Sequence, residues 1–256
     1  MSLLDIPYLI LLVTHGVAAW YDYKTREIPD KVWIGAMIAA SFTIYVILHS
    51  SIIDKILYLS NLIAGLALAS LCYIFKIVGG ADIKSIIAIA LSCPPLVHIS
   101  NSLLLTVLNL PTIAVVSNAI IVVVLYTLYI VFKNLKTFDI CTKKYVISSA
   151  RKIILFITAL CVPVKEVLKN HHKYAVILDR DPKLVSLYRI CLEDPRDLLK
   201  SLVEKGKTNP EDYVLAVYYM PYIVCIFVGL LIYYVAHLSV AALVYRSIAT
   251  LIMIHH

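Results

Sequence analysis

Apolar stretches alternate with short polar connections over the first 132 residues, and apolar residues dominate again near the C-terminus. About 20 apolar residues form a helix that crosses a bilayer. No Asp, Glu, Lys or Arg lies between Lys84 and Lys133, which leaves room for two helices and a turn. The pattern therefore predicts six spans: Ile6–Tyr21, Val32–His49, Ile56–Phe75, a stretch that begins near Ala81, Pro111–Phe132 and Val214–Ala236.

Three features interrupt or follow these spans. Pro94-Pro95 is expected to kink or break the fourth span, because proline removes a backbone donor. The apolar run Ile153–Val164 is too short to span and is expected to lie at the interface or against the bundle. After Ala236 the chain either extends the sixth span or lies at the interface.

Residues 134–212 carry most of the charge and are predicted to form a small mixed α/β insert. The chain is therefore predicted to have three parts. Residues 1–133 contain five spans, residues 134–212 form the insert, and residues 213–256 contain the sixth span and a tail. Within the insert, two β-runs flank a turn, and a helix begins at Pro195 after the N-cap Asp194 and stops at Gly206. The β-runs are Tyr174–Leu178 and Leu184–Leu192, and the turn is Asp179–Pro182.

Composition supports a membrane protein: 61% of the 256 residues are hydrophobic, against about 45–50% in soluble domains. The net charge of +7 does not indicate nucleic acid, because 16 of the 23 Lys and Arg residues lie between Lys133 and Lys207. Of the others, only Lys55 and Arg246 fall on the opposite side of the six-span topology. The positive-inside rule then places the insert in the cytoplasm and the N-terminus outside.

Cysteine and histidine do not indicate a metal or a disulfide framework. The six cysteines are scattered without a CxxC pair, and we interpret them as buried, reduced thiols. His15 and the terminal His255-His256 lack partners at metal-ligand spacing. The sequence therefore predicts neither a metal site nor another cofactor.

Carboxylates are rare in the first 132 residues, and the topology sorts them. Asp5 and Asp54 fall outside, whereas Asp22 ends the first span and Asp82 begins the fourth, both at the cytoplasmic face. A carboxylate beside a lipid-embedded helix is costly and is a candidate for function. The alternative for each is structural: Asp22 as a juxtamembrane charge paired with Lys24 or Arg26, and Asp82 as a helix N-cap.

Two neighbouring carboxyls share a proton, so that one deprotonates water while the other protonates a peptide carbonyl oxygen or amine. Gly79-Gly80 before Asp82 permits an unusual turn and the close approach of an extended substrate. Because Asp82 lies at a helix N-terminus and Asp22 at a helix C-terminus, we expect Asp82 to be the ionised base and Asp22 to hold the proton.

The segments around both aspartates resemble the motifs of the archaeal type IV prepilin peptidases and preflagellin (prearchaellin) peptidases, which are GxGD-class aspartyl proteases. The matching residues are Asp22, Lys24, Arg26, Ile28 and Pro29 in the first motif, and Gly79, Gly80, Ala81, Asp82 and Lys84 in the second. Ala81 stands where many relatives have glycine. The bacterial branch's cysteine-rich domain and methylation activity are not expected, since no CxxC pair occurs. Met220-Pro221-Tyr222 does not match the Pro-Ala-Leu motif of presenilin-like relatives.

The resemblance implies that Asp22 and Asp82 are catalytic and that the substrates are archaellin or pilin preproteins. These carry a short basic leader before a hydrophobic helix, and cleavage occurs at the cytoplasmic face. Lys24, Arg26 and Lys84 are interpreted first as membrane-surface anchors, with a second role in holding the loop. Glu27 and Asp30 either attract the leader or merely balance Lys24 and Lys31.

Two other functions stay open from the sequence. A proton-coupled transporter would use Asp22 and Asp82 as a relay, but it favours acids near the bilayer midplane. A membrane-anchored scaffold would present the basic insert and would not need either aspartate. For the insert itself, a solvated surface facing lipid headgroups and a platform that positions substrate are both compatible with its charge.

Overall fold

The computed structural model describes residues 5–76, 78–95, 102–142, 149–170, 173–176, 195–206, 208–236 and 239–254. The chain forms two compact units and is mostly helical. Unit 1 contains Met1–Val123 and Pro221–His256, and unit 2 contains Val124–Met220. The predicted boundaries at residues 133 and 212 stay a prediction.

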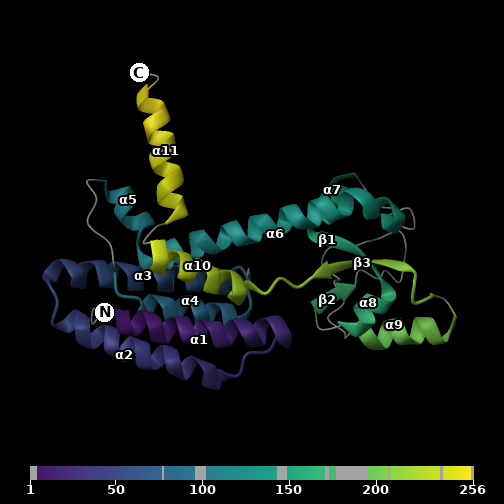
Figure 1. Ribbon diagram of the computed structural model, residues 1–256, viewed down its shortest axis with the longest axis horizontal. Coiled ribbons are helices and arrows are strands. Elements are labelled where there is room, and N and C mark those ends of the chain that lie inside the picture. The colour runs from purple at the N-terminus through teal and green to yellow at the C-terminus, as the bar shows by residue number, and fades with distance from the viewer. Residues whose placement is uncertain are drawn as a thin grey trace. The chain divides into compact units, whose positions relative to one another are not determined.

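Unit 1 is built from helices that pack along their lengths. Figure 1 shows α1, α2, α4 and α10 side by side, and the contacts between these elements agree. The elements are α1 (Asp5–Lys24), the 3₁₀ turn η1 (Asp30–Trp33), α2 (Ile34–Leu48), α3 (Ile52–Ile74), α4 (Gly80–Ser92), α5 (Leu103–Leu108), the first part of α6 (Pro111–Thr142), α10 (Tyr222–Ala236) and α11 (Val240–Ile254).

Three helical segments of the described chain are long and apolar enough to cross a membrane: Asp30–Leu48, Ile52–Ile74 and Pro111–Thr142. A fourth is Tyr222–Ala236 together with Val240–Thr250 if this pair, bent by 63°, counts as one span. Helix α1 is 20 residues long but has polar residues along it, and α4 has only 13 residues. Length and apolarity thus support three or four spans, and the predicted number of six is not confirmed.

Helix α4 is short because Pro94-Pro95 prevents its continuation, as the sequence predicts. Its last carbonyls therefore lack intrahelical partners. Side chains of neighbouring helices donate hydrogen bonds to them instead: Asn61 Nδ2 to Ala90 O (3.1 Å), Tyr58 OH to Leu91 O (2.8 Å) and Thr43 Oγ1 to Ser92 O (2.6 Å). The Ser92 hydroxyl in turn donates to Ala36 O at 2.9 Å. These bonds fix the C-terminal end of α4 between α2 and α3.

Unit 2 combines the second part of α6 with a small antiparallel sheet in the order β1-β3-β2. Ala159 pairs with Val217 and Tyr174 with Tyr218, and an apolar core that includes Val162, Val176 and Leu199 lies between sheet and helices. The elements are α7 (Ser149–Thr158), β1 (Ala159–Pro163), α8 (Val164–Lys169), β2 (Tyr174–Val176), α9 (Pro195–Glu204) and β3 (Tyr213–Tyr218).

Several predictions for the insert can be compared with unit 2. A mixed α/β composition is confirmed, as are the start of α9 at Pro195 and its stop before Gly206, which has a φ of 64°. Strand β2 lies within the predicted run that begins at Tyr174. The second β-run, the turn Asp179–Pro182 and the N-cap Asp194 fall outside the described residues.

Two strands were not predicted. The run Ile153–Val164 was expected at the interface or against the bundle, but its second half is β1. The sixth span was expected from Val214, but the residues there form β3 before α10 begins at Tyr222. In both cases short apolar runs do not distinguish strand from helix, and the pairing of β1 with β3 decides.

Cys141 and Cys161 form a disulfide between the end of α6 and β1, so the interpretation of these two as reduced thiols is wrong. Their separation of 20 residues follows no short motif, and only the fold brings them together. Cys72, Cys93 and Cys225 are buried and free, as expected. Cys191 lies outside the described residues.

A close helix contact in unit 1 depends on Gly229 of α10. A Cβ at this position would collide with the carbonyl oxygen of Val115 and would lie 2.9 Å from the backbone nitrogen of Ala119, both on α6. Backbone atoms cannot rotate away as a side chain could. Small residues at such crossings let membrane helices approach closely.

We therefore expect Gly229→Ala to lower the free energy of unfolding by about 1–3 kcal/mol, since the added methyl group forces α10 away from α6. The measurement is the midpoint of unfolding in mixed detergent micelles with increasing dodecyl sulfate. Gly16→Ala is the matched control, because its Cβ would meet only the Phe227 ring at an ordinary 3.5 Å. Equal midpoints for both variants would contradict the argument.

Candidate active site

Asp22 lies in the last turn of α1 and is largely enclosed, with 14% of its side chain exposed. Its Oδ2 atom accepts a hydrogen bond from the Ile223 N–H at 3.0 Å, and its Oδ1 atom lies 3.6 Å from Nη1 of Arg26. The N–H belongs to the first turn of α10, where backbone donors have no intrahelical partner. Asp22 is thus held between its own helix end and the start of another helix.

Arg26 reaches Asp22 because of the way α1 ends. The N–H groups of Thr25 and Arg26 both donate to Tyr21 O, at 2.8 and 3.2 Å, and Arg26 has a φ of 63°. This left-handed conformation is common after a helix but usually taken by glycine, so an arginine there costs free energy. The turn leads the chain back and directs the guanidinium toward the carboxylate four residues earlier.

Asp82 lies in the first turn of α4, where its Oδ2 atom accepts the Gly79 N–H at 3.0 Å. The side chain therefore helps to cap its own helix from the third helical position, whereas the N-cap itself is Gly79 and not Asp82, as the structural alternative had it. Gly79 has a φ of −73°, so the expected unusual backbone is not found there. A Cβ on Gly80 would meet nothing within 4 Å, so the space at this position is open.

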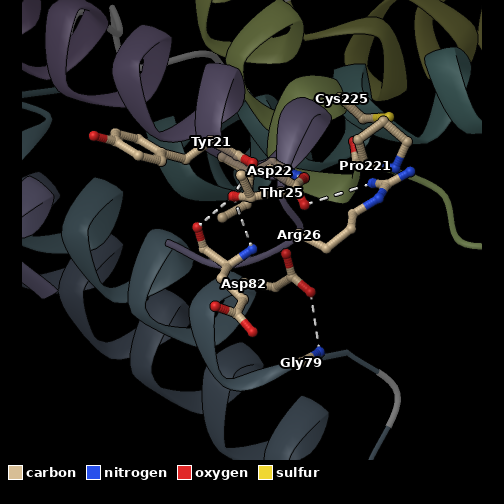
Figure 2. Close-up of polar contacts among 10 residues, drawn as sticks. Tyr21, Asp22, Thr25, Arg26, Gly79, Asp82, Pro221 and Cys225 are labelled. Carbon is tan, nitrogen blue, oxygen red and sulfur yellow. Dashed lines mark hydrogen bonds and ion pairs between the residues drawn. The ribbon is translucent and has the colours of Figure 1, made fainter. Parts of the chain in front are cut away.

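The structure brings the two aspartates together although 59 residues lie between them in the chain (82 − 22 − 1). Their charges interact, and helices α1, α4 and α10 all contact one another. Figure 2 shows Asp22, Arg26 and Asp82 gathered in one place, with Gly79 on one side and Pro221 and Cys225 on the other. Three helix ends thus meet at one site.

The surroundings affect the two carboxyls differently. Burial raises the pKa of Asp82 to about 6; the Gly79 N–H opposes this rise and the charge of Asp22 adds to it. Burial also raises the pKa of Asp22, but the Arg26 guanidinium and the Ile223 N–H lower it. Both groups lie outside the three helices that are long enough to span a membrane. Because the Arg26 charge and the Ile223 N–H favour the Asp22 anion, Asp82 keeps its proton to higher pH than Asp22 does.

This result reverses the expectation that Asp82 is ionised and Asp22 protonated. The expectation considered only the end of the helix that carries each aspartate. The start of α10 adds a second helix N-terminus, which faces Asp22 and favours its anion. The sequence contained a signal for the start of α10, because Pro221 stands directly before an apolar run and proline is common at the start of a helix.

The other motif residues surround the site rather than enter it. Lys84 forms an exposed ion pair with Asp30 at 2.5 Å, which joins α4 to η1 and contributes little stability. Lys24 lies 4.9 Å from the Trp20 ring centre. Ile28 and Ala81 pack on the apolar cluster Ala18, Ala19 and Ile223, and Pro29 precedes η1.

His15 connects the helices that carry the aspartates. Its Nε2 atom and the Ser85 hydroxyl of α4 are hydrogen-bonded at 3.0 Å, while Nδ1 lies 3.0 Å from Leu11 O. Both side chains are fully buried, and Ser85 lies one turn after Asp82. Within the described chain, His, Cys, Asp and Glu side chains form no group of three that could hold a metal ion.

Comparison with known proteins adds one finding. Residues 9–128 match the family model described as the type IV leader peptidase family, and this match contains both aspartates. It covers just under half of the chain and ends within α6. No curated protein matches the sequence.

Asp82→Asn is expected to stabilise the chain above pH 6. A pKa raised to about 6 means that the folded state holds the proton more tightly than the unfolded state, so ionisation costs stability as the pH rises through 6. Asparagine avoids this cost and keeps an acceptor for the Gly79 N–H. We expect a gain of about 2–3 kcal/mol at pH 7.5 and none at pH 4, measured by dodecyl sulfate unfolding in mixed micelles. Asp54→Asn is the control, and equal gains at both pH values would contradict the ionisation argument.

Proposed function

We propose that this chain, which belongs to the type IV leader peptidase family, is a membrane aspartyl endopeptidase that removes the short basic leader of archaellin or type IV pilin-like preproteins. The family indicates a peptidase that processes prepilin-type leader peptides. The aspartyl mechanism, the archaellin substrates and cleavage at the cytoplasmic face are parts of the proposal.

The observation that carries the proposal is the meeting of Asp22 and Asp82 beside the start of α10. Two carboxyls with different proton affinities are the minimum that water-mediated peptide hydrolysis needs. The open space at Gly80, two residues before Asp82 in the chain, leaves room for an extended peptide to approach the start of α4. A structural N-cap alone would explain Asp82 but not the burial of a second carboxyl beside it.

In the proposed reaction, ionised Asp22 takes a proton from water, whose oxygen attacks the carbonyl carbon of the scissile peptide. Protonated Asp82 donates its proton to the carbonyl oxygen, so that a neutral diol forms. The proton on Asp22 then passes to the leaving nitrogen, the C–N bond breaks, and a hydroxyl proton of the diol returns to Asp82. Arg26 and the Ile223 N–H keep Asp22 ionised before attack.

The proposed topology keeps six spans and a cytoplasmic site. It adds α1, over Ile6–Tyr21, and the apolar part of α4 after Asp82 to the longer helices. Packing of α1 and α4 against α2, α3 and α10 supports this arrangement, since neighbours shield their polar atoms from lipid. The distribution of Lys and Arg supports the orientation. A basic leader in the cytosol would then reach Asp22 and Asp82 while its hydrophobic helix stays in the bilayer.

Purified wild type in detergent is expected to cleave a preprotein that has a basic leader, whereas Asp22→Asn and Asp82→Asn are expected to reduce cleavage below detection. Each substitution removes one of the two proton-transfer groups and preserves shape. The product is identified by N-terminal sequencing. Asp54→Asn, at the start of α3, is the matched control and should cleave as wild type does.

The same assay separates the proposal from the other two functions. A wild type that leaves several such preproteins intact would refute the protease. Cleavage that survives both Asp→Asn substitutions would refute the catalytic pair and leave the family activity to other residues. Transport of protons that depends on both aspartates, without cleavage, would favour the transporter.

Arg26→Gln is expected to shift the pH profile of kcat/KM upward. Without the guanidinium the pKa of Asp22 rises, so the carboxyl needed as base stays protonated to higher pH, and the acid limb of the profile moves to higher pH. The alkaline limb, from Asp82, should move less, since other causes of its raised pKa remain. Lys24→Gln is the control. The two apparent pKa values of the profile belong to the coupled pair of aspartates, so both limbs are fitted together. An unshifted profile would contradict the role of Arg26.

A further inference from the structure

Helix α6 is longer than a membrane is thick. It has 32 residues, about 48 Å at 1.5 Å per residue, whereas the hydrocarbon layer measures about 30 Å. Its uncharged part runs from Pro111 to Phe132, and Lys133 and Lys136 follow. The helix therefore continues beyond the hydrocarbon by several turns, through the depth of the lipid headgroups.

The apolar surface of α6 does not stop at the lysines. Leu125, Leu128 and Phe132 form an exposed stripe on α6 within unit 2, and Leu135 and Ile140 extend it, with Leu135 67% exposed. Spacings of three, four and three residues place Leu125, Leu128, Phe132 and Leu135 along one side of the helix, and Ile140 follows five residues later at the edge of this stripe. The stripe that is exposed at Leu128 thus continues beyond Phe132, the last residue of the uncharged part.

Helix α7 adds a second exposed apolar surface at the same depth along α6. Its Leu155 is buried against Phe138 and Cys141 in the last turns of α6, and Phe156 stacks edge-on against Phe138. On the opposite side of α7, Ile153, Ile154 and Ile157 are exposed. One face of α7 therefore packs into the core of unit 2, whereas the three isoleucines on its other face are not covered by the described residues.

Charge at this surface favours an anionic partner. Lys152 of α7 lies 3.5 Å from Asp139 of α6, so the exposed sides of the two helices meet there. That pair is neutral, and Lys133 and Lys136 leave the group with an excess of two positive charges. Lysines beside an apolar helix face are typical of segments that lie in the headgroup layer.

We propose that the interfacial face of unit 2, formed by Leu135, Ile140, Ile153, Ile154 and Ile157, lies in the headgroup layer of an anionic bilayer. The isoleucines enter the boundary with the acyl chains, and Lys133 and Lys136 contact lipid phosphates. A lipid partner fits better than a protein because the face continues the exposed stripe of a helix that is long and apolar enough to cross the same membrane. This inference concerns unit 2 and does not depend on the proposed cleavage.

The test places a nitroxide at Ile154 through Ile154→Cys in the full-length chain, reconstituted in bilayers that contain phosphatidylglycerol. Oxygen concentrates in the hydrocarbon and a nickel chelate stays in water, so relaxation by each reports depth. Leu128→Cys is the lipid reference, and Lys200→Cys, at an exposed position of α9, is the water reference. Wild type carried through the same labelling reports any signal from native cysteines.

We expect the label at Ile154 to lose relaxation by the nickel chelate and to gain relaxation by oxygen, as at Leu128. Nickel relaxation equal to that at Lys200 would overturn the proposal. Weak relaxation by both reagents would overturn it too, since it means that protein covers the face. Ile153 and Ile157 are labelled in turn, so that one misfolded variant does not decide the result.

A second measurement tests the role of charge. In bilayers of phosphatidylcholine alone, the label at Ile154 should lie nearer to water than in the anionic bilayers. Lys133→Gln combined with Lys136→Gln should remove that difference between the two lipids. A depth that is the same in both lipids for the wild type would refute the anionic partner.

Discussion

Buried carbonyl groups at the C-terminal end of α4 impose the main constraint on unit 1. Pro94-Pro95 ends this helix where its last residues are buried, and an unpaired carbonyl there would cost several kcal/mol. Thr43, Tyr58 and Asn61 provide the missing donors from α2 and α3. Because hydrogen bonds are directional, these contacts fix both the depth and the rotation of α4.

The candidate site depends on that constraint at the other end of the same short helix. With α4 fixed, the position of Asp82 follows, and the His15–Ser85 hydrogen bond fixes α1 beside it. The start of α10 then meets the end of α1 and donates to Asp22. The three helix ends therefore give the two carboxyls different hydrogen-bond donors and different neighbouring charges. That difference, more than the presence of two acids, is what general acid–base chemistry requires.

Sequence patterns predicted the features that depend on local rules. The break at Pro94-Pro95, the helix starts at Pro111 and Pro195 and the apolar helices follow from proline geometry and from hydrophobic length. The distribution of Lys and Arg along the chain predicts that Asp22 and Asp82 lie at the same membrane face, and this stays a prediction. Strands β1 and β3 were not predicted, because a short apolar run fits either a helix or a strand until the strand that pairs with it is known.

The sequence by itself determined an apolar helical protein with two motif-bearing aspartates, because composition, motif and periodicity need no knowledge of distant contacts. Only the tertiary structure decided that the two carboxyls meet, that α10 joins them, and that Cys141 pairs with Cys161. It also decided which aspartate has the more strongly raised pKa. A pKa depends on burial and on donors within a few ångströms, and at Asp22 one of those donors comes from Ile223, which is 201 residues away in the chain.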